Sequence, residues 1–167
     1  MVEVEVAGVK VDLRSNSPVL LLQERSSPYR VVPIFIGVPE ANAIDLVLSR
    51  VEPQRPLTHD LIKLVMDELD AQIERVVVTE LRNGTYFADL VMLAGGIDRV
   101  ISARPSDAIA IALRSDAPIF VSDAIMNAEG TVIEEGEPEE ADEGSQETIV
   151  GQFREFLNEI RPEDFSE

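Results

Sequence analysis

The chain has 167 residues and a formal net charge of −18, from 14 Lys and Arg against 32 Asp and Glu side chains. Its 45% hydrophobic and 28% charged residues are typical of a water-soluble globular protein with one domain and an additional segment. The chain has no cysteine, which excludes disulfides and zinc or iron–sulfur sites held by cysteine. It has one histidine, His59, which excludes a multi-histidine metal site within one chain. No segment approaches the roughly 18 apolar residues of a membrane span, and the Val and Glu alternation of residues 1–10 differs from a signal peptide. We therefore expect a cytoplasmic protein without membrane contact.

The negative charge is concentrated in the last quarter of the chain. Residues 123–167 carry a net charge of −13, whereas residues 1–122 carry −5. The Glu-, Gly- and Pro-rich composition of residues 128–147 predicts a flexible acidic linker, because so few apolar residues cannot offset the entropy cost of ordering. Residues 148–167 are predicted to form a C-terminal amphipathic helix, capped by Thr148, and a tail. The apolar face of this helix consists of Ile149, Val150, Phe153, Phe156, Leu157 and Ile160.

Residues 1–127, the predicted domain, begin with strand patterns. Residues 2–13 alternate Val with polar residues and break the alternation at Gly8, which predicts a long strand with a bulge. Apolar runs at residues 19–23 and 30–36 are separated by a turn-forming Arg-Ser-Ser-Pro segment. The three strands together are expected to form a meander.

Three helices are predicted within the domain. The first covers residues 41–50, after a helix start at Pro39 and Glu40. The second begins at Thr58, and the third runs from residue 104 to 113. The predicted buried face of the second helix consists of Leu61, Ile62, Leu64, Val65 and Leu69.

Further strands are predicted between and after these helices. Residues 75–81 and 86–93 flank an Asn-Gly pair, which is a strong hairpin signal. Residues 97–103 continue the series, and residues 118–122 form a short closing strand. Strands joined by hairpins, with helices inserted between groups, predict an α+β fold with a mixed, largely antiparallel sheet and three helices.

Polar and charged side chains gather where the three helices begin. They are Glu40 at the first helix, Arg55, Thr58, His59 and Asp60 at the second, and Arg104, Ser106 and Asp107 at the third. Helix N-termini present unpaired backbone N–H groups and the positive end of the helix dipole, which suits them to hold phosphate. The chain lacks the GxGxxG, GxxxxGK[ST] and GxSxG motifs, so nucleotide-binding folds and serine hydrolases have no support.

Four segments carry a resemblance to a known family. They are IGVPEANAI at residues 36–44, RPLTHDL at 55–61, GTYFA at 84–88 and RPSDAIAIALR at 104–114. In this order they resemble the bifunctional nuclease domain family over about residues 1–127. The resemblance implies a compact α+β domain that forms a homo-oligomer, with a dimer favoured, and that acts on both DNA and RNA. The acidic C-terminal segment does not resemble the UvrB/UvrC-type motif that some relatives carry there.

Phosphodiester hydrolysis requires neutralised phosphate charge, a positioned water and a proton for the leaving group, commonly with Mg²⁺ or Mn²⁺ held by carboxylates. Glu40, Asp60 and Asp107 are the candidate catalytic carboxylates and the candidate ligands of such a metal ion. His59 is the candidate proton-transfer group, because imidazole alone has an unperturbed pKa near neutrality. No organic cofactor is expected. The candidate phosphate-binding residues are Arg55, Arg104, Ser106 and Thr58.

Each candidate also has a structural interpretation. The carboxylates stabilise the positive ends of helix dipoles, and Thr58, Ser106 or Asp107 caps a helix. Arg55 and Arg104 form ion pairs with Asp60 or Asp107, and His59 is a polar surface residue. Tyr86 and Phe87 alternate across a strand, so one is expected in the core and one on the surface, and they are further candidates for base stacking.

Two functions follow from these alternatives. The first is a metal-assisted nuclease acting on DNA and RNA, and the second is a non-enzymatic, oligomeric module that holds an anionic ligand. In the second case, residues 148–160 contact a protein partner, a second subunit or the domain itself. Most nucleic-acid-binding proteins have a basic footprint, so a nuclease with this charge needs a local arginine-lined groove. The acidic segment is predicted to shield that groove, which is a hypothesis of electrostatic autoinhibition.

Overall fold

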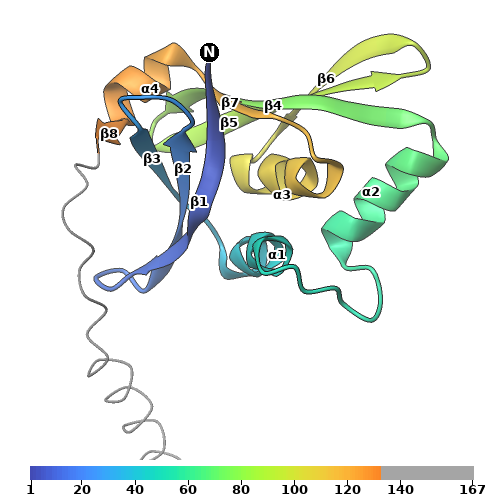
Figure 1. The fold of residues 1–167 in the computed structure, drawn as a ribbon, viewed down its shortest axis with the longest axis horizontal. Helices are drawn as coiled ribbons and strands as arrows, with labels where there is room; N and C mark the ends of the chain where they lie inside the picture. The colour runs from blue at the N-terminus through green and yellow to red at the C-terminus, as the bar shows by residue number, and fades with distance from the viewer. Residues whose placement is uncertain (133–167) are drawn as a thin grey trace, which may run out of the picture. The chain divides into compact units, whose positions relative to one another are not determined.

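An eight-stranded sheet organises residues 1–132, the part of the chain that the computed structural model describes (Figure 1). The strands are β1 (Val2–Asp12), β2 (Ser17–Glu24), β3 (Arg30–Phe35), β4 (Ala71–Arg82), β5 (Thr85–Ala94), β6 (Ile97–Ala103), β7 (Ile119–Val121) and β8 (Thr131–Val132). Their order across the sheet is β6-β5-β4-β7-β1-β2-β3-β8. Neighbouring strands are antiparallel except β4 and β7, which are parallel. The predicted α+β fold with a mixed, largely antiparallel sheet is confirmed.

Three of the four helices in this part of the chain lie together. The helices are α1 (Val38–Leu48), α2 (Thr58–Glu68), α3 (Pro105–Ser115) and α4 (Asp123–Glu129). Helix α3 contacts β4 and β5 on one side and both α1 and α2 on the other. Figure 1 shows α1, α2 and α3 grouped beneath the sheet, with α4 apart from them beside β8. Helix α3 is therefore the element that holds the other two against the sheet.

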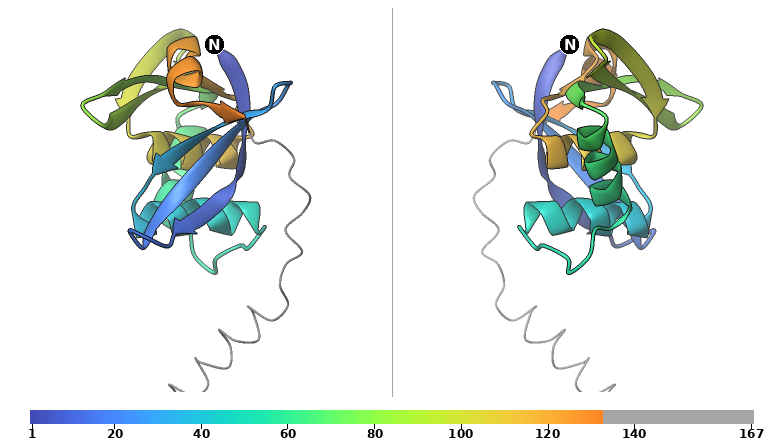
Figure 2. Two further views of the ribbon diagram at one scale, coloured as in Figure 1. Left: turned by 90° about the vertical axis from the view of Figure 1, so that its left-hand side faces the viewer. Right: turned by 90° about the vertical axis from the view of Figure 1, so that its right-hand side faces the viewer.

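Two backbone features explain why strand pairing could be predicted locally. The ladder between β1 and β2 shifts register between Val6 and Gly8, which is the predicted bulge. Figure 2 shows β1, β2 and β3 side by side, as expected for a meander. Asn83 and Gly84 both have positive φ, 51° and 76°, which matches a type I′ turn between β4 and β5.

The core lies between the sheet and α3. Five consecutive α3 residues, Ala108 to Ala112, are buried, and the small alanines among them allow close packing on both sides. Fully buried Leu20, Leu22, Val76 and Val78 come from the central strands. Because the start of α3 is attached to this core, the side chains on its first turn occupy fixed positions.

The prediction for the buried face of α2 is wrong. Leu61, Leu64 and Val65 are 56%, 48% and 49% exposed, and Leu69 is 70% exposed. The buried residues of α2 are His59 and Met66, seven positions and thus about two turns apart. The helix contacts α3 and β4 along this narrow line. The polar His59 side chain is therefore buried, while most of the apolar side chains of α2 face outward.

Two short elements beyond the predicted strands were missed. Helix α4 is capped by Ser122, whose hydroxyl accepts a hydrogen bond from the backbone N–H of Ile125 at 3.3 Å. Strand β8 pairs with β3 through Arg30 and Val132, so ordered elements continue past residue 127. The rest of the predicted acidic linker and the predicted C-terminal helix lie outside the described residues. None of the helices within residues 1–132 is long and apolar enough to cross a membrane.

Candidate active site

A groove of about 880 Å³ lies where α1, α2 and α3 begin. Glu40 lines it from the first turn of α1, and Thr58 and His59 line it from the first turn of α2. Arg104, immediately before α3, and Asp107, in the first turn of α3, also line it, as does Asn42 of α1. The structure thus brings together candidates from three segments that are far apart in the sequence.

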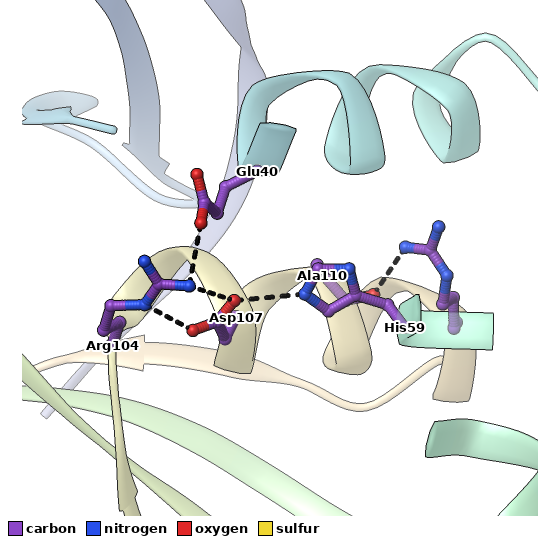
Figure 3. Close-up of polar contacts among 6 residues, drawn as sticks. Glu40, His59, Arg104, Asp107 and Ala110 are labelled. Carbon is purple, nitrogen blue, oxygen red and sulfur yellow. Dashed lines mark hydrogen bonds and ion pairs between the residues drawn. The ribbon is translucent and has the colours of Figure 1, made fainter. Parts of the chain in front are cut away.

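Asp107 is at the centre of a polar network in this groove (Figure 3). Its Oδ1 lies 3.1 Å from His59 Nε2 and accepts a hydrogen bond from Arg104 Nη2 at 3.0 Å. Its Oδ2 accepts a second hydrogen bond from Arg104 Nε at 2.6 Å. Arg104 Nη2 also lies 2.8 Å from Glu40 Oε1. One guanidinium therefore links the two carboxylates, and one carboxylate links the guanidinium to the imidazole.

The members of the network differ in exposure. His59 is 9% exposed, and the side chain of Glu40 is 14% exposed. The Asp107 side chain is 29% exposed, whereas that of Arg104 is 66% exposed. The His59 imidazole is thus largely shielded from solvent, whereas the Arg104 guanidinium is accessible to a ligand.

The ionisation of Asp107 determines the tautomer of His59. Burial of Asp107 raises the pKa of its carboxyl, but hydrogen bonds from Arg104 and His59 outweigh burial, so the pKa lies below its ordinary value. An ionised carboxylate only accepts hydrogen bonds, so Nε2 of His59 carries the proton that lies between them. In the neutral imidazole, Nδ1 is then the acceptor nitrogen.

Arg104 retains donor capacity beyond its two carboxylate partners. Its Nε and Nη2 contact Asp107 and Glu40, whereas Nη1 has no hydrogen-bond partner within residues 1–132. A guanidinium has five N–H donors in a planar fork. The two N–H groups of Nη1 are available to a phosphate oxygen.

Asp60 takes part in a different contact. Its Oδ1 accepts a hydrogen bond from Arg114 Nε at 2.5 Å, and its Oδ2 accepts one from the backbone N–H of Leu57 at 2.8 Å. Arg114 also donates to the carbonyl oxygen of Ala110 at 2.9 Å, so the pair fastens the start of α2 to α3. Burial raises the pKa of Asp60, but the hydrogen bonds from Arg114 and Leu57 outweigh it and lower the pKa.

The three predicted metal-binding carboxylates are not gathered at one point. Within residues 1–132, no three His, Asp or Glu side chains form a group that could hold a metal ion. Glu40 and Asp107 face the same guanidinium, and Asp60 faces Arg114. In this arrangement a divalent cation would have to displace Arg104, so the residues do not fit a preformed Mg²⁺ or Mn²⁺ site.

The remaining predicted residues lie at or near the groove in other roles. Leu57, not Thr58, is the N-cap of α2, and Arg104, not Ser106 or Asp107, is the N-cap of α3. The predicted ion pair between Arg104 and Asp107 is confirmed.

Ser106 is buried and lines a second groove. Arg55 is exposed and has no ion pair within the described part of the chain.

Comparison with known proteins assigns the domain. A family model described as the bifunctional nuclease domain matches residues 20–134, which is more than half of the chain and includes the whole polar network. The chain belongs to the bifunctional nuclease domain family. The resemblance that the four segments carry is confirmed.

The relatives differ in how much of their length is shared. An uncharacterized protein of Mycobacterium tuberculosis is 44% identical over 167 residues, covering 99% of this chain and 98% of its own length. Bifunctional nuclease 1 of Arabidopsis thaliana is 28% identical over 123 residues, 71% of this chain and 38% of its own length. Bifunctional nuclease 2 of the same plant is 30% identical over 110 residues, 64% of this chain and 33% of its own length.

Two residues that support the site in this bifunctional nuclease domain were not predicted from the sequence. Arg114 ends the RPSDAIAIALR segment, and its position in the last turn of α3 was the only signal of its role. Gly37, the N-cap of α1, leaves room for Glu40, since a Cβ at residue 37 would overlap Glu40 Oε2. The pairing of Arg104 with Glu40 depends on this space.

Proposed function

We propose that this member of the family is a nuclease that hydrolyses phosphodiester bonds in DNA and RNA at the groove between α1, α2 and α3. The observation that carries the proposal is Asp107, which joins an inward-facing imidazole to an outward-facing guanidinium. Proton transfer and phosphate binding are the two tasks that hydrolysis assigns to such groups. The family membership supports the same reaction class.

Each residue has a distinct role in this proposal. Arg104 Nη1 donates hydrogen bonds to a non-bridging phosphate oxygen, and the backbone N–H groups at the nearby helix starts add to this contact. His59 accepts at Nδ1 the proton of the water whose oxygen forms a bond to phosphorus. The bond between phosphorus and the leaving sugar oxygen breaks, and this oxygen takes a proton from solvent water. Asp107 holds the Nε2–H tautomer and stabilises the imidazolium that forms. Glu40 helps to position Arg104 through Nη2, the nitrogen that also donates to Asp107.

Metal assistance remains a separate proposal. Mg²⁺ or Mn²⁺ would supply Lewis-acid stabilisation of the phosphate if it bound beside the substrate. The guanidinium already pairs with both carboxylates of the groove, so the mechanism above assigns no step to a metal ion. Assays with and without metal separate the two cases.

The test is hydrolysis of single- and double-stranded DNA and RNA by the full chain in Mg²⁺, Mn²⁺ or EDTA. Loss of the proton-transfer group in His59→Ala is expected to lower the rate by about 10²- to 10⁴-fold. Asp107→Asn is expected to lower it similarly, because an amide does not hold the same tautomer. Asp67→Asn is the matched control, since Asp67 pairs with Lys63 on the exposed side of α2. Activity that survives both His59→Ala and Asp107→Asn would contradict the proposal.

The exposed apolar side chains of α2 favour a second candidate, a homo-oligomeric binding module. Leu61, Leu64, Val65 and Leu69 form an apolar surface of a kind that commonly marks protein interfaces. In this case the polar groove holds an anionic ligand without cleaving it. The same assay discriminates, because a module binds substrate without releasing product under any metal condition.

A further inference from the structure

A second groove lies beside the first and shares Arg104 with it. It has a volume of about 390 Å³ and is formed by the end of β3, the turn between β4 and β5, and the start of α3. Arg104 lines both grooves and is the one residue that their linings share within residues 1–132. A ligand group held by Arg104 can therefore extend to either side.

The chemistry of the second groove differs from that of the first. Its lining includes three hydroxyl-bearing residues, Ser17, Thr85 and Ser106, and two aromatic residues, Phe35 and Tyr86. Arg104 is the only charged residue of the lining within residues 1–132, whereas the first groove also holds Glu40 and Asp107. The second groove therefore suits a neutral, ring-containing group attached to an anion.

Phe35 is an exposed aromatic residue of this groove. It lies at the end of β3 opposite Val19 and is 63% exposed, on the same face of the strand as exposed Pro33, whereas Ile34 between them is buried in the core. Tyr86 is half-buried, packs partly against the core and also lines the groove. Aromatic side chains beside a cationic group provide surfaces on which nucleic-acid bases stack.

We propose that the second groove binds the nucleoside next to the scissile phosphate of a single-stranded nucleic acid. This inference rests on the proposed nuclease function and assigns its substrate. With a phosphodiester on Arg104 Nη1, one neighbouring nucleoside extends toward His59 and the other into the second groove. Its base stacks on Phe35 and Tyr86, and the groove hydroxyls bind sugar or base edges. A base in a duplex is already paired and stacked, so single strands are the preferred ligand.

Binding of a fluorescein-labelled, eight-nucleotide single-stranded DNA to the full chain tests this assignment. Fluorescence anisotropy is measured in EDTA at low salt, and a gel confirms that the probe stays intact. A matched probe of the same length with abasic residues has the same phosphates but no bases. We expect the wild type to bind the base-containing probe more tightly. Phe35→Ala is expected to weaken that binding at least about fivefold and to leave abasic binding unchanged.

Two variants control for the fold. Tyr29→Ala removes an exposed aromatic that lines neither groove and is expected to bind like the wild type. Phe35→Leu keeps apolar volume without an aromatic face, and we expect it to lose base-dependent binding as well. The assignment is wrong if the wild type binds neither probe, binds both equally, or if Phe35→Leu binds like the wild type. The binding experiment measures no cleavage, so its result does not depend on the outcome of the hydrolysis assay. If the protein hydrolyses nucleic acid but binds both probes equally, the nuclease function stands and only the proposed nucleoside subsite is rejected.

Discussion

Arg104 has to satisfy two carboxylates and remain available to a ligand. With His59 neutral, Glu40, Asp107 and Arg104 give the network one excess negative charge. Attraction of a phosphate therefore depends on the unshared Nη1 group and on the helix starts, not on net positive charge. Small displacements of the guanidinium should change activity strongly, because two N–H groups provide the contact.

Gly37→Ala is predicted to act through this guanidinium. A Cβ at residue 37 would overlap Glu40 Oε2, and Glu40 is the second carboxylate, besides Asp107, that holds Arg104. Gly37 has φ −75° and ψ 157°, a conformation that alanine adopts, so the fold should be retained. We expect hydrolysis to fall by roughly 10- to 100-fold, measured as kcat/KM alongside the thermal unfolding midpoint.

A double-mutant cycle with Glu40→Ala provides the control for Gly37→Ala. Once the Glu40 side chain is removed, the extra methyl group has nothing to displace, so the second substitution should add little. Independent, additive losses at the two positions would show that Gly37 acts in some other way.

The start of α2 is fixed to α3 by two polar contacts. His59 contacts Asp107, and Asp60 contacts Arg114, whose side chain is 7% exposed. Most of the apolar residues of α2 face outward, so these contacts and Met66 determine where the helix lies. The position of the imidazole thus depends on a neighbouring ion pair that lines a separate pocket.

Asp60→Asn is predicted to destabilise the protein in a pH-dependent way. The pKa of Asp60 is lowered in the folded state, so its contribution is present above the unfolded pKa, near 4, and is lost as pH falls through the folded value. At pH 7 we expect a loss of about 1.5–3 kcal/mol in the free energy of unfolding, because Arg114 loses a charged partner. Urea unfolding at pH 7 and near pH 2 should show the difference between variant and wild type shrinking at low pH.

Asp67→Asn supplies the comparison within the same helix. Asp67 is about half exposed and pairs with Lys63 one turn earlier, a contact worth less than about 0.5 kcal/mol. A loss at Asp60 no larger than that at Asp67, or one that persists unchanged at low pH, would argue against the role of the Asp60 pair.

The elements that could be predicted are those determined by the pattern of neighbouring residues in the sequence. The bulge at Gly8 and the turn at Asn83 and Gly84 follow from neighbouring residues, and both are present. The face of α2 could not be predicted, because helical periodicity shows which residues share a face but not whether another element covers it. The Asp60 and Arg114 contact joins residues 54 positions apart, which no short motif encodes.

At the scale of the whole chain, charge and site are separated along the sequence. Residues 133–167 carry a net charge of −11, and residues 1–132, which contain both grooves, carry −7. Repulsion between exposed charges and a polyanion extends over a Debye length of about 30 Å at 0.01 M salt but only about 8 Å at 0.15 M. The predicted shielding of the site by the acidic segment should therefore depend on salt.

Replacing six glutamates by glutamine tests that shielding without shortening the chain. The substitutions are at Glu134, Glu135, Glu137, Glu139, Glu140 and Glu143, and they raise the net charge by six. At 0.01 M salt we expect single-stranded DNA to bind several-fold more tightly than to the wild type, since less charge repels it, and at 0.3 M salt the difference should nearly vanish. Glu→Asp at the same six positions keeps the charge and should bind like the wild type. If that control also gained affinity, or if the gain persisted at 0.3 M salt, the effect would not come from electrostatic repulsion.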